Sequence, residues 1–282
     1  MNILITGCNG QLGNEIQLLQ AQYAQHTWLN TDVNELDITD KAAIERFVEE
    51  NEIGGIVNCA AYTAVDKAES DPQLARKLNA DAPAYLAEAV AKRGGWMVQG
   101  STDYVFNGTK HTPYVETDEP CPNSVYGQTK LEGEQAVSKL CPNAMIIRTA
   151  WLYSEFGNNF VKTMIRLGRE REQLGVIFDQ VGTPTYAHDL ATAIMTAIDK
   201  GIKPGVYHFS NEGVTSWYDF TKSIHRLSGI NTCQVSPLHT AEYPTPACRP
   251  AYSVLDKTKI KDAYGIEIPH WEESLAKCIA KL

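Results

Sequence analysis

The chain has 282 residues, 43% of them hydrophobic and 21% charged, with a formal net charge of −9, which is ordinary for a folded protein with a sizeable core. No apolar run approaches the roughly 20 residues of a membrane helix, and no basic run could follow a phosphate backbone. We therefore expect that the protein neither spans a membrane nor binds nucleic acids. Seven scattered cysteines without a CxxC pair predict reduced thiols rather than disulfides or a metal site. No apolar leader precedes the first strand-like run, so we expect a cytoplasmic protein.

Short apolar runs alternate with amphipathic stretches in the first half of the chain, which is typical of βαβ units and a parallel sheet. The predicted strands cover residues 3–6, 27–30, 56–61, 96–101 and 144–149. Right-handed crossovers then give an α/β fold with a Rossmann-type doubly wound parallel sheet. Helical periodicity between Leu74 and Val90 is expected to be interrupted at Pro83, which lacks a backbone donor.

After residue 149 the pattern becomes irregular, with helices expected near 158–170 and 188–199 and a strand at 206–210. We assign residues 1–150 to a dinucleotide-binding Rossmann domain. Residues 151–282 are assigned to a smaller C-terminal substrate-binding lobe, and residues 185–210 are expected to return to the first domain.

A glycine-rich loop, TGCNGQLG, follows the first predicted strand and opens a helix with Gly7, Gly10 and Gly13. Glycine allows a tight turn and a close backbone approach, and the N–H groups at a helix start attract an anion. The GxxGxxG spacing at this place predicts a dinucleotide pyrophosphate site, although glycine-rich turns without a ligand are also common.

An acidic residue, Asp32, follows Gly13 by nineteen positions and stands just after the second predicted strand. A carboxylate about 20 residues beyond the glycine loop typically binds the adenosine ribose. No Arg or Lys occurs between Asp32 and Asp40, so a 2′-phosphate would meet a carboxylate without a nearby cation. The sequence therefore favours NADH over NADPH, with a simple turn cap as the alternative role of Asp32.

A tyrosine and a lysine, Tyr126 and Lys130, lie four positions apart in SVYGQTK, a spacing that puts both on one face of a helix. The same spacing recurs at Tyr218 and Lys222, so the surroundings must decide between the pairs. Ser101 and Thr102 stand at the C-terminal end of the fourth predicted strand, where open α/β sheets bind ligands, and Tyr126 follows after a long loop. We predict that Thr102, Tyr126 and Lys130 are catalytic and that Tyr218 is not.

Six segments carry a resemblance to a known family: TGCNGQLG, NCAAYTAVDKAE, STDYVF, VYGQTK, RTAWLY and TPACRP. They make the chain similar to the extended short-chain dehydrogenase/reductase family. The resemblance implies reduction of the 4-keto group of a dTDP-linked sugar with NADH or NADPH, and it is compatible with a homodimer. The implied cofactor site has Gly10, Gln11 and Leu12 at the pyrophosphate, Asp32 at the ribose, Asp37 and Ile38 at the adenine, Ala61, Tyr62 and Thr63 along one wall, and Tyr126 and Lys130 at the nicotinamide ribose.

The same resemblance places Thr102, Asp103 and Trp151 against the sugar nucleotide and Arg249 at its diphosphate. Two of these residues have a second interpretation. Trp151 also suits a core position, and Arg249 also suits a structural salt bridge with an acidic residue such as Glu242.

A metal is a further implication, because some relatives are described as binding Mg²⁺ between subunits through glutamates. Glu15 has a suitable position after the glycine loop. The segment HDLA at 188–191 offers no second glutamate, so the sequence gives little support for Mg²⁺.

Reduction of a sugar ketone needs a hydride on carbon and a proton on oxygen, and Tyr126 is the expected proton donor. A free phenol titrates near 10, so a pKa poised near 7 requires about 4 kcal/mol of extra phenolate stabilisation. The ammonium of Lys130 and the charge of the oxidised nicotinamide are expected to provide it, while Thr102 hydrogen-bonds the substrate oxygen.

Three alternatives accompany this interpretation. A 4,6-dehydratase is disfavoured because Thr102 is followed by Asp103 and Tyr104, without the second carboxylate that such enzymes usually carry. An epimerase of the same family stays open, and so does a non-catalytic regulatory subunit resembling the β subunit of methionine adenosyltransferase.

Overall fold

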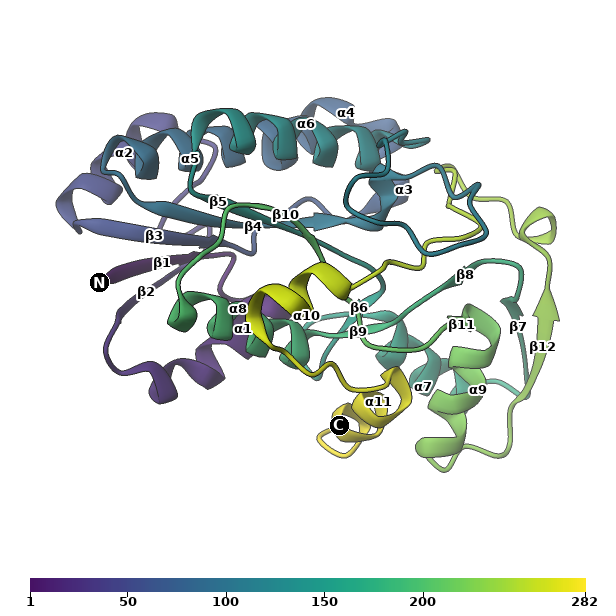
Figure 1. The fold of residues 1–282 in the computed structure, drawn as a ribbon. Helices are drawn as coiled ribbons and strands as arrows, with labels where there is room; N and C mark the ends of the chain where they lie inside the picture. Colours follow the sequence, from purple (N-terminus) through teal and green to yellow (C-terminus); the bar gives the residue numbers. More distant parts are fainter.

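The computed structural model covers residues 1–282, and its central feature is one parallel sheet of six strands (Figure 1). The strands are β1 (Asn2–Thr6), β2 (Thr27–Thr31), β3 (Ile53–Asn58), β4 (Trp96–Thr102), β5 (Ala144–Thr149) and β10 (Gly205–His208). Their order is β10-β5-β4-β3-β1-β2, and every neighbouring pair is parallel. The strand order reverses between β1 and β3, where open α/β sheets bind ligands. The predicted Rossmann-type doubly wound sheet is confirmed.

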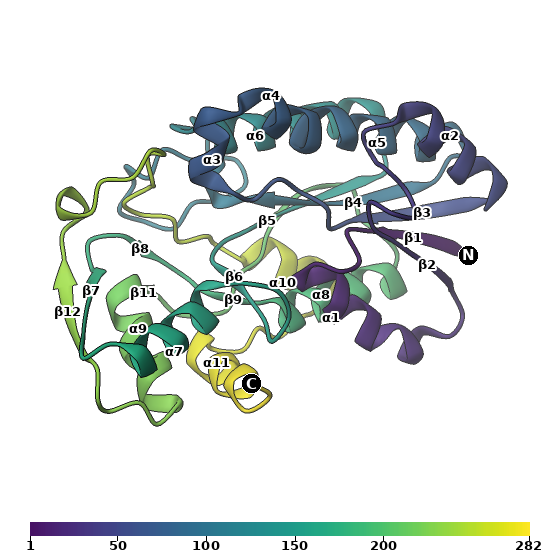
Figure 2. The same cartoon turned by 180° about the vertical axis from the view of Figure 1, so that it is seen from behind.

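Helices cover both faces of this sheet (Figure 2). One face carries α2 (Lys41–Glu50), α3 (Val65–Ser70), α4 (Pro72–Arg76), α5 (Ala82–Lys92) and α6 (Val125–Leu140), and the other carries α1 (Gln11–Leu19), α8 (Ala187–Lys200) and α10 (Thr258–Tyr264). Successive residues of a strand point to opposite faces. Ile3 and Ile5 accordingly pack under α1 and α8, while Leu4 packs in the cluster on the other side. Burial on both faces explains why the strands are continuous apolar runs.

The helical segment before β4 runs from α4 through a π turn (Lys77–Asp81) into α5 without a break. Pro83 lies in the first turn of α5, where its missing N–H is tolerated because the hydrogen-bonding pattern is already changing. The interruption expected at Pro83 is therefore a change of helix type within one continuous segment.

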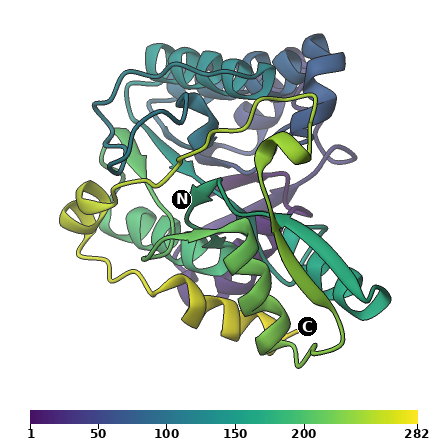
Figure 3. The same ribbon diagram turned by 90° about the vertical axis from the view of Figure 1, so that its right-hand side faces the viewer.

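The second lobe follows β5 and contains three short strand pairs (Figure 3). They are β6 (Leu152–Tyr153) with β9 (Thr185–Tyr186), β7 (Gln173–Ile177) with β12 (Gln234–Leu238), and β8 (Val181–Gly182) with β11 (Thr215–Ser216). The helices α7 (Phe160–Glu170), α9 (Trp217–Leu227) and α11 (Trp271–Ile279) pack with them. Their shared core contains Tyr153, Phe220 and Trp271. Short 3-10 turns occur at Gln20–Tyr23, Asp103–Val105 and Thr240–Glu242.

None of the helices is both long enough and apolar enough to span a bilayer. Three elements of the second half of the chain, α8, β10 and α10, join the six-stranded sheet and its helical layer. The remaining elements after β5 leave the C-terminal ends of the sheet strands bordered by the second lobe (Figure 1).

Candidate active site

The glycine loop joins β1 to α1, and its path requires glycine. Gly7 has a φ of +64°, and a Cβ there would lie 2.7 Å from the Ala60 nitrogen, so a side chain would be excluded. At Gly13 a Cβ would lie 2.5 Å from the Gly7 oxygen, which means that α1 packs directly on the loop. The helix begins after Gly10 without a side-chain cap, so its first N–H groups are available to an anion.

Gln11 and Leu12 form the start of α1. The side chain of Leu12 is buried in the core under the sheet, so only its backbone can serve a ligand. Gln11 instead reaches the second lobe, because its Oε1 accepts a hydrogen bond from Asn159 Nδ2 at 3.0 Å. The loop is therefore fixed on one side by the core and on the other by the second lobe.

Asp32 directly follows β2 and is tied to the glycine loop. Its carboxylate accepts hydrogen bonds from the backbone N–H of Asn9 (3.1 Å) and of Val33 (2.8 Å). Glu35 accepts the N–H of Asp32 at 2.9 Å. Burial, followed by the charges of Asp32 and Glu35, raises the pKa of the Cys8 thiol. The potential at the end of β2 is thus negative, which opposes a 2′-phosphate.

Asp37 and Ile38 lie beyond this turn. Asp37 Oδ1 accepts from the Thr39 hydroxyl (2.7 Å) and N–H (2.9 Å), and these hydrogen bonds hold the pKa of the Asp37 carboxyl below its usual value. Ile38 is buried with the residues beneath α2. Both residues therefore shape the turn, and Ile38 presents little side-chain surface to a ligand.

The segment Ala61, Tyr62 and Thr63 follows β3 and is held by one side chain. Asn79 accepts the Tyr62 N–H at 2.9 Å and donates to the Tyr62 carbonyl at 3.1 Å. The Tyr62 ring packs against the small cluster that includes Tyr126. This segment therefore connects the glycine loop region with the start of α6.

Thr102 and Tyr126 meet at the C-terminal end of β4. Thr102 is the last residue of β4, and its hydroxyl donates to Asp103 Oδ1 at 3.0 Å. Tyr126 stands in the first turn of α6, which Ser124 caps by accepting the Gly127 N–H at 3.1 Å. Both side chains are buried, and Thr102 is close enough to influence the pKa of the Tyr126 phenol. The structure thus brings these two predicted residues together.

The phenol of Tyr126 is held in its protonated form. Burial raises the pKa of Tyr126 to about 12, with the Thr102 hydrogen bond lowering it and the Asp103 carboxylate raising it. A protonated phenol at neutral pH is the state that a proton donor requires. The Nζ of Lys130, which was expected to lower this pKa, donates to the Gly100 carbonyl at 2.6 Å, and the phenol of Tyr126 is not among its hydrogen-bond partners.

Lys130 lies one turn beyond Tyr126 and is 4% exposed. Burial lowers the pKa of its ammonium to about 8, and the nearby Glu134 opposes this fall. Glu134 is paired with Arg148 of β5 through Nε (2.9 Å) and Nη2 (2.7 Å), and it also accepts the hydroxyl of Ser101. This buried network fixes α6 against β4 and β5 beside Thr102 and Tyr126.

Asp103 and Tyr104 directly follow Thr102 and begin the short 3-10 turn after β4. Burial raises the pKa of Asp103 to about 6, against hydrogen bonds from two neighbouring hydroxyl groups. The Tyr104 ring meets Tyr126 edge-on at 5.4 Å between centroids. Burial and the Asp103 charge raise the pKa of Tyr104, whereas Arg249 lowers it. Arg249 is therefore close enough to influence Tyr104, whose ring packs on Tyr126.

Trp151 comes directly after β5 and has a φ of +49°, a conformation that costs a non-glycine residue about 1 kcal/mol or more. Its ring stacks on Trp217 with centroids 3.5 Å apart and an angle of 10°. Trp151 is half-buried and packs against the core of the second lobe. It therefore combines a core contact with a position between the sheet and the second lobe.

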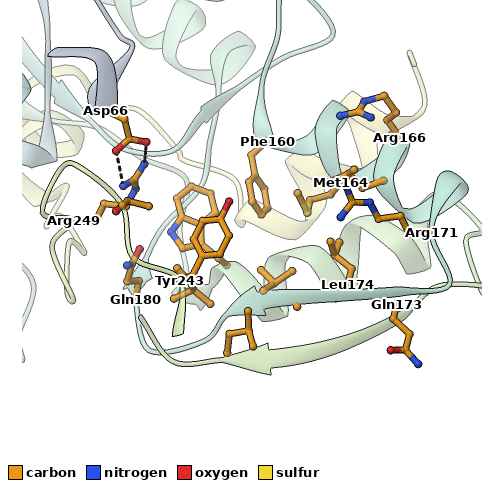
Figure 4. A pocket seen from close by; sticks show the side chains of 17 residues that line it. Asp66, Phe160, Met164, Arg166, Arg171, Gln173, Leu174, Gln180, Tyr243 and Arg249 are labelled. Carbon is orange, nitrogen blue, oxygen red and sulfur yellow. Dashed lines mark hydrogen bonds and ion pairs between the residues drawn. The ribbon is translucent and has the colours of Figure 1, made fainter. Parts of the chain in front are cut away.

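A cavity of about 840 Å³ lies in the second lobe (Figure 4). The strands β7 and β12, the helix α7 and the loop after the last 3-10 turn surround it, with Phe160, Trp217 and Tyr243 among its walls. The Asp66–Arg249 pair stands at one end, and Arg166 and Arg171 stand at the other (Figure 4). Trp217 lines the cavity and stacks on Trp151, so the cavity lies beside the segment that follows β5.

Arg249 is paired with Asp66 rather than with Glu242. Its Nη1 and Nη2 lie 3.1 and 2.8 Å from the two carboxylate oxygens of Asp66, and this pairing holds the pKa of Asp66 below its usual value. Glu242 instead accepts the N–H of His239 at 2.7 Å. Because Asp66 belongs to α3 and Arg249 follows β12, the ion pair connects the helical layer of the sheet with the segment that lines one end of the cavity.

Tyr218, with the same spacing to a lysine as Tyr126, lies on α9. It packs against the core of the second lobe, in a different cluster from Tyr126. Sequence reasoning missed four residues that shape the site: Asp66, Gly100, Glu134 and Trp217. Only Asp66 had a signal, because it stands inside the TAVDKAE segment.

The surroundings of Glu15 do not fit Mg²⁺. Glu15 is fully buried and accepts from His188 Nδ1 at 2.9 Å. The adjacent Glu155 is bound by Tyr186 Oη (2.9 Å) and Lys281 Nζ (2.8 Å). Mg²⁺ needs octahedral oxygen ligands and usually keeps several waters. Glu15 Oε1 is buried without a hydrogen-bond partner, but no group of three or more acidic, histidine or cysteine side chains is placed to hold a metal ion.

Comparison with known proteins gives consistent matches over the whole chain. Residues 1–282 match the family described as RmlD substrate binding domain. The dTDP-4-dehydrorhamnose reductase of Aggregatibacter actinomycetemcomitans is 42% identical over 97% of this chain and 96% of its own length. The crystal structure of a dTDP-4-dehydrorhamnose reductase from Clostridium acetobutylicum has a TM-score of 0.95 and 48% identity, covering 100% of this chain and 99% of that one. The Bacillus anthracis dTDP-4-dehydrorhamnose reductase, solved in complex with NADP, has a TM-score of 0.95 and 38% identity with the same coverage.

Proposed function

The chain belongs to the RmlD substrate binding domain family, and on this premise we propose that it reduces the 4-keto group of dTDP-4-dehydro-L-rhamnose to give dTDP-L-rhamnose. It is an oxidoreductase that uses NADH or NADPH. The full-length relatives bear the name of this activity. The observation that carries the proposal is the proximity of the buried Thr102 and Tyr126 side chains at the C-terminal end of β4, with Lys130 one helical turn away. We call these three residues the catalytic corner.

The glycine loop fits a dinucleotide, because the uncapped start of α1 offers N–H groups to a pyrophosphate and Asp32 stands where a ribose is bound. When bound, the reduced nicotinamide supplies the hydride. Tyr126 donates the proton to the carbonyl oxygen, and Thr102 hydrogen-bonds that oxygen as charge develops on it. Lys130 carries the buried positive charge of the site and binds the nicotinamide ribose.

The sugar nucleotide extends from the catalytic corner into the second lobe. Asp103 and Trp151 border the sugar, and Arg249 lies next to Tyr104 at the mouth of the cavity, where it binds the diphosphate. The apolar and aromatic walls of the cavity suit the nucleoside. This orientation follows from the edge-on packing of Tyr104 on Tyr126 and from the electrostatic influence of Arg249 on the Tyr104 phenol.

Consumption of reduced cofactor tests the reaction. Purified protein with NADH and dTDP-4-dehydro-L-rhamnose should oxidise one cofactor for each product molecule formed. An epimerase would convert the sugar without net cofactor oxidation, and a regulatory subunit would show no turnover. Folded protein that oxidises neither NADH nor NADPH with this substrate would refute the proposal.

Two further features belong to the proposed function. The protein acts in the cytoplasm, because reduced nicotinamide cofactors and nucleotide sugars are used there. We propose a homodimer as the assembled form, since the family resemblance is compatible with one, and sedimentation analysis of the purified protein tests this state.

A further inference from the structure

Asn159 connects the cofactor loop to the wall of the cavity. It is the N-cap of α7, where its Oδ1 accepts the Lys162 N–H at 3.1 Å. Its Nδ2 donates to the Ser154 carbonyl at 2.7 Å and to Gln11 Oε1 at 3.0 Å. One side chain therefore holds the start of α7, the loop before it and the first residue of α1.

The orientation of the Asn159 amide is fixed by its two backbone partners. The Lys162 N–H can only donate, so it faces the amide oxygen, and the Ser154 carbonyl can only accept, so it faces the amide nitrogen. The remaining contact, with Gln11, must then run from the Asn159 nitrogen to the Gln11 oxygen. The direction of this hydrogen bond is thus determined by the backbone.

Both ends of this contact border a proposed ligand site. Gln11 follows Gly10 at the start of α1, beside the pyrophosphate site. Phe160 follows Asn159, lines the cavity and packs against Trp217 with centroids 4.5 Å apart. A second contact lies beside this hydrogen bond, because Gln11 Nε2 donates to the Leu152 carbonyl at 3.5 Å. The segment 152–160 therefore packs against the side chain of Gln11, the first residue of α1.

We propose that Asn159 is a positioning residue that couples cofactor binding to binding of the nucleotide part of the substrate. The coupling rests on the proposed function, since it needs both ligands. Ordering of the α1 start by the cofactor orients Gln11, Gln11 holds Asn159, and Asn159 holds the first turn of α7 with Phe160 in the cavity wall. By linkage, dTDP must tighten NADH binding by the same factor as NADH tightens dTDP binding.

Asn159→Ser tests the coupling without removing the helix cap. Serine is as good an N-cap as asparagine, but it is too short to reach Gln11. The matched control is Asn158→Ser, because Asn158 is exposed and makes no side-chain hydrogen bond. Calorimetric titration should give the Kd of dTDP with and without saturating NADH, and the thermal midpoint should be measured on the same samples.

We expect NADH to tighten dTDP binding about 5-fold or more in the unmodified protein and in Asn158→Ser, since one net hydrogen bond of about 1 kcal/mol corresponds to that factor. In Asn159→Ser the ratio should fall toward one, with little change in the thermal midpoint. Asn159→Asp, which keeps the cap and loses the donor, should behave alike. An unchanged ratio in both Asn159 variants, or a ratio of one in the unmodified protein, overturns the coupling alone. Failure of folded, unmodified protein to bind either ligand overturns the proposed function as well.

Discussion

Arg249→Ala is the substitution that separates a substrate contact from a structural ion pair. In the protein the guanidinium is held by Asp66 across the mouth of the cavity. If Arg249 binds the diphosphate, the carboxylate of Asp66 holds it in position and competes with the ligand for it. The change should then weaken dTDP binding strongly and affect the stability of the fold only slightly.

The exposure of the two side chains sets the magnitudes. Arg249 is 23% exposed and Asp66 is 39% exposed, and a pair so accessible to solvent contributes about 0–1 kcal/mol to stability. A charge-assisted contact with phosphate contributes about 1.5–3 kcal/mol, which corresponds to a rise in the Kd of dTDP of about 10- to 150-fold. Lysine at this position should recover only part of the loss, because an ammonium cannot bind two phosphate oxygens in the way that a guanidinium can.

The assay measures dTDP affinity and the thermal midpoint on the same preparations of Arg249→Ala and Asp66→Asn. Asp66→Asn frees the guanidinium, so dTDP affinity should stay the same or increase. A purely structural pair predicts instead that both variants lose the same stability and that both bind dTDP equally well once folded. Unchanged dTDP affinity in fully folded Arg249→Ala would refute the diphosphate role.

Three further predictions test the catalytic corner and the cofactor site. Tyr126→Phe should lower kcat by about 10²- to 10⁴-fold because the proton donor is lost, with NADH affinity kept; near-normal turnover, or equal damage from Tyr218→Phe, would contradict the assignment. Asp32→Ala should shift the ratio of kcat/KM values from NADH toward NADPH, whereas a strong NADPH preference in the unmodified protein would show that a distant cation overrides this carboxylate. Burial lowers the pKa of Lys130 to about 8, so the ammonium loses its proton as the pH rises through that value and kcat/KM should fall there. Lys130→Arg keeps its charge and should lack this alkaline limb; a limb that persists in this variant would belong to another group.

The sheet could be predicted because its strands are buried on both faces and therefore read as apolar runs. The predicted strand at 144–149 agrees with β5, and the one at 96–101 falls one residue short of β4. β3 begins at Ile53, earlier than predicted. Glycine has a low strand propensity, so Gly54 and Gly55 made the start of this strand look like a loop. The structure explains the second glycine, since a Cβ at Gly55 would lie 2.3 Å from the Trp96 ring.

The pair β7 and β12 could not be predicted, since each strand finds its partner far along the chain and carries little apolar periodicity. The positions of Thr102 and Tyr126 could be predicted from the sequence because they stand at a strand end and a helix start that local patterns reveal. The partners of the charged side chains could not be predicted from the sequence. Arg249 pairs with Asp66, which is 183 positions away, and Lys130 is engaged by a backbone carbonyl, a contact that no side-chain pattern encodes.

The late arrival of α8 and β10 determines the order in which this molecule can be completed during synthesis. β10 covers the edge of β5, and α8 supplies Leu190, Ile194 and Ile198 to the core beneath the sheet. Until residue 208 has left the ribosome, the nascent sheet keeps an open edge and an uncovered apolar face, the features that make a folding intermediate prone to aggregation. The sheet that carries the glycine loop therefore becomes complete only after several elements of the second lobe have been synthesised.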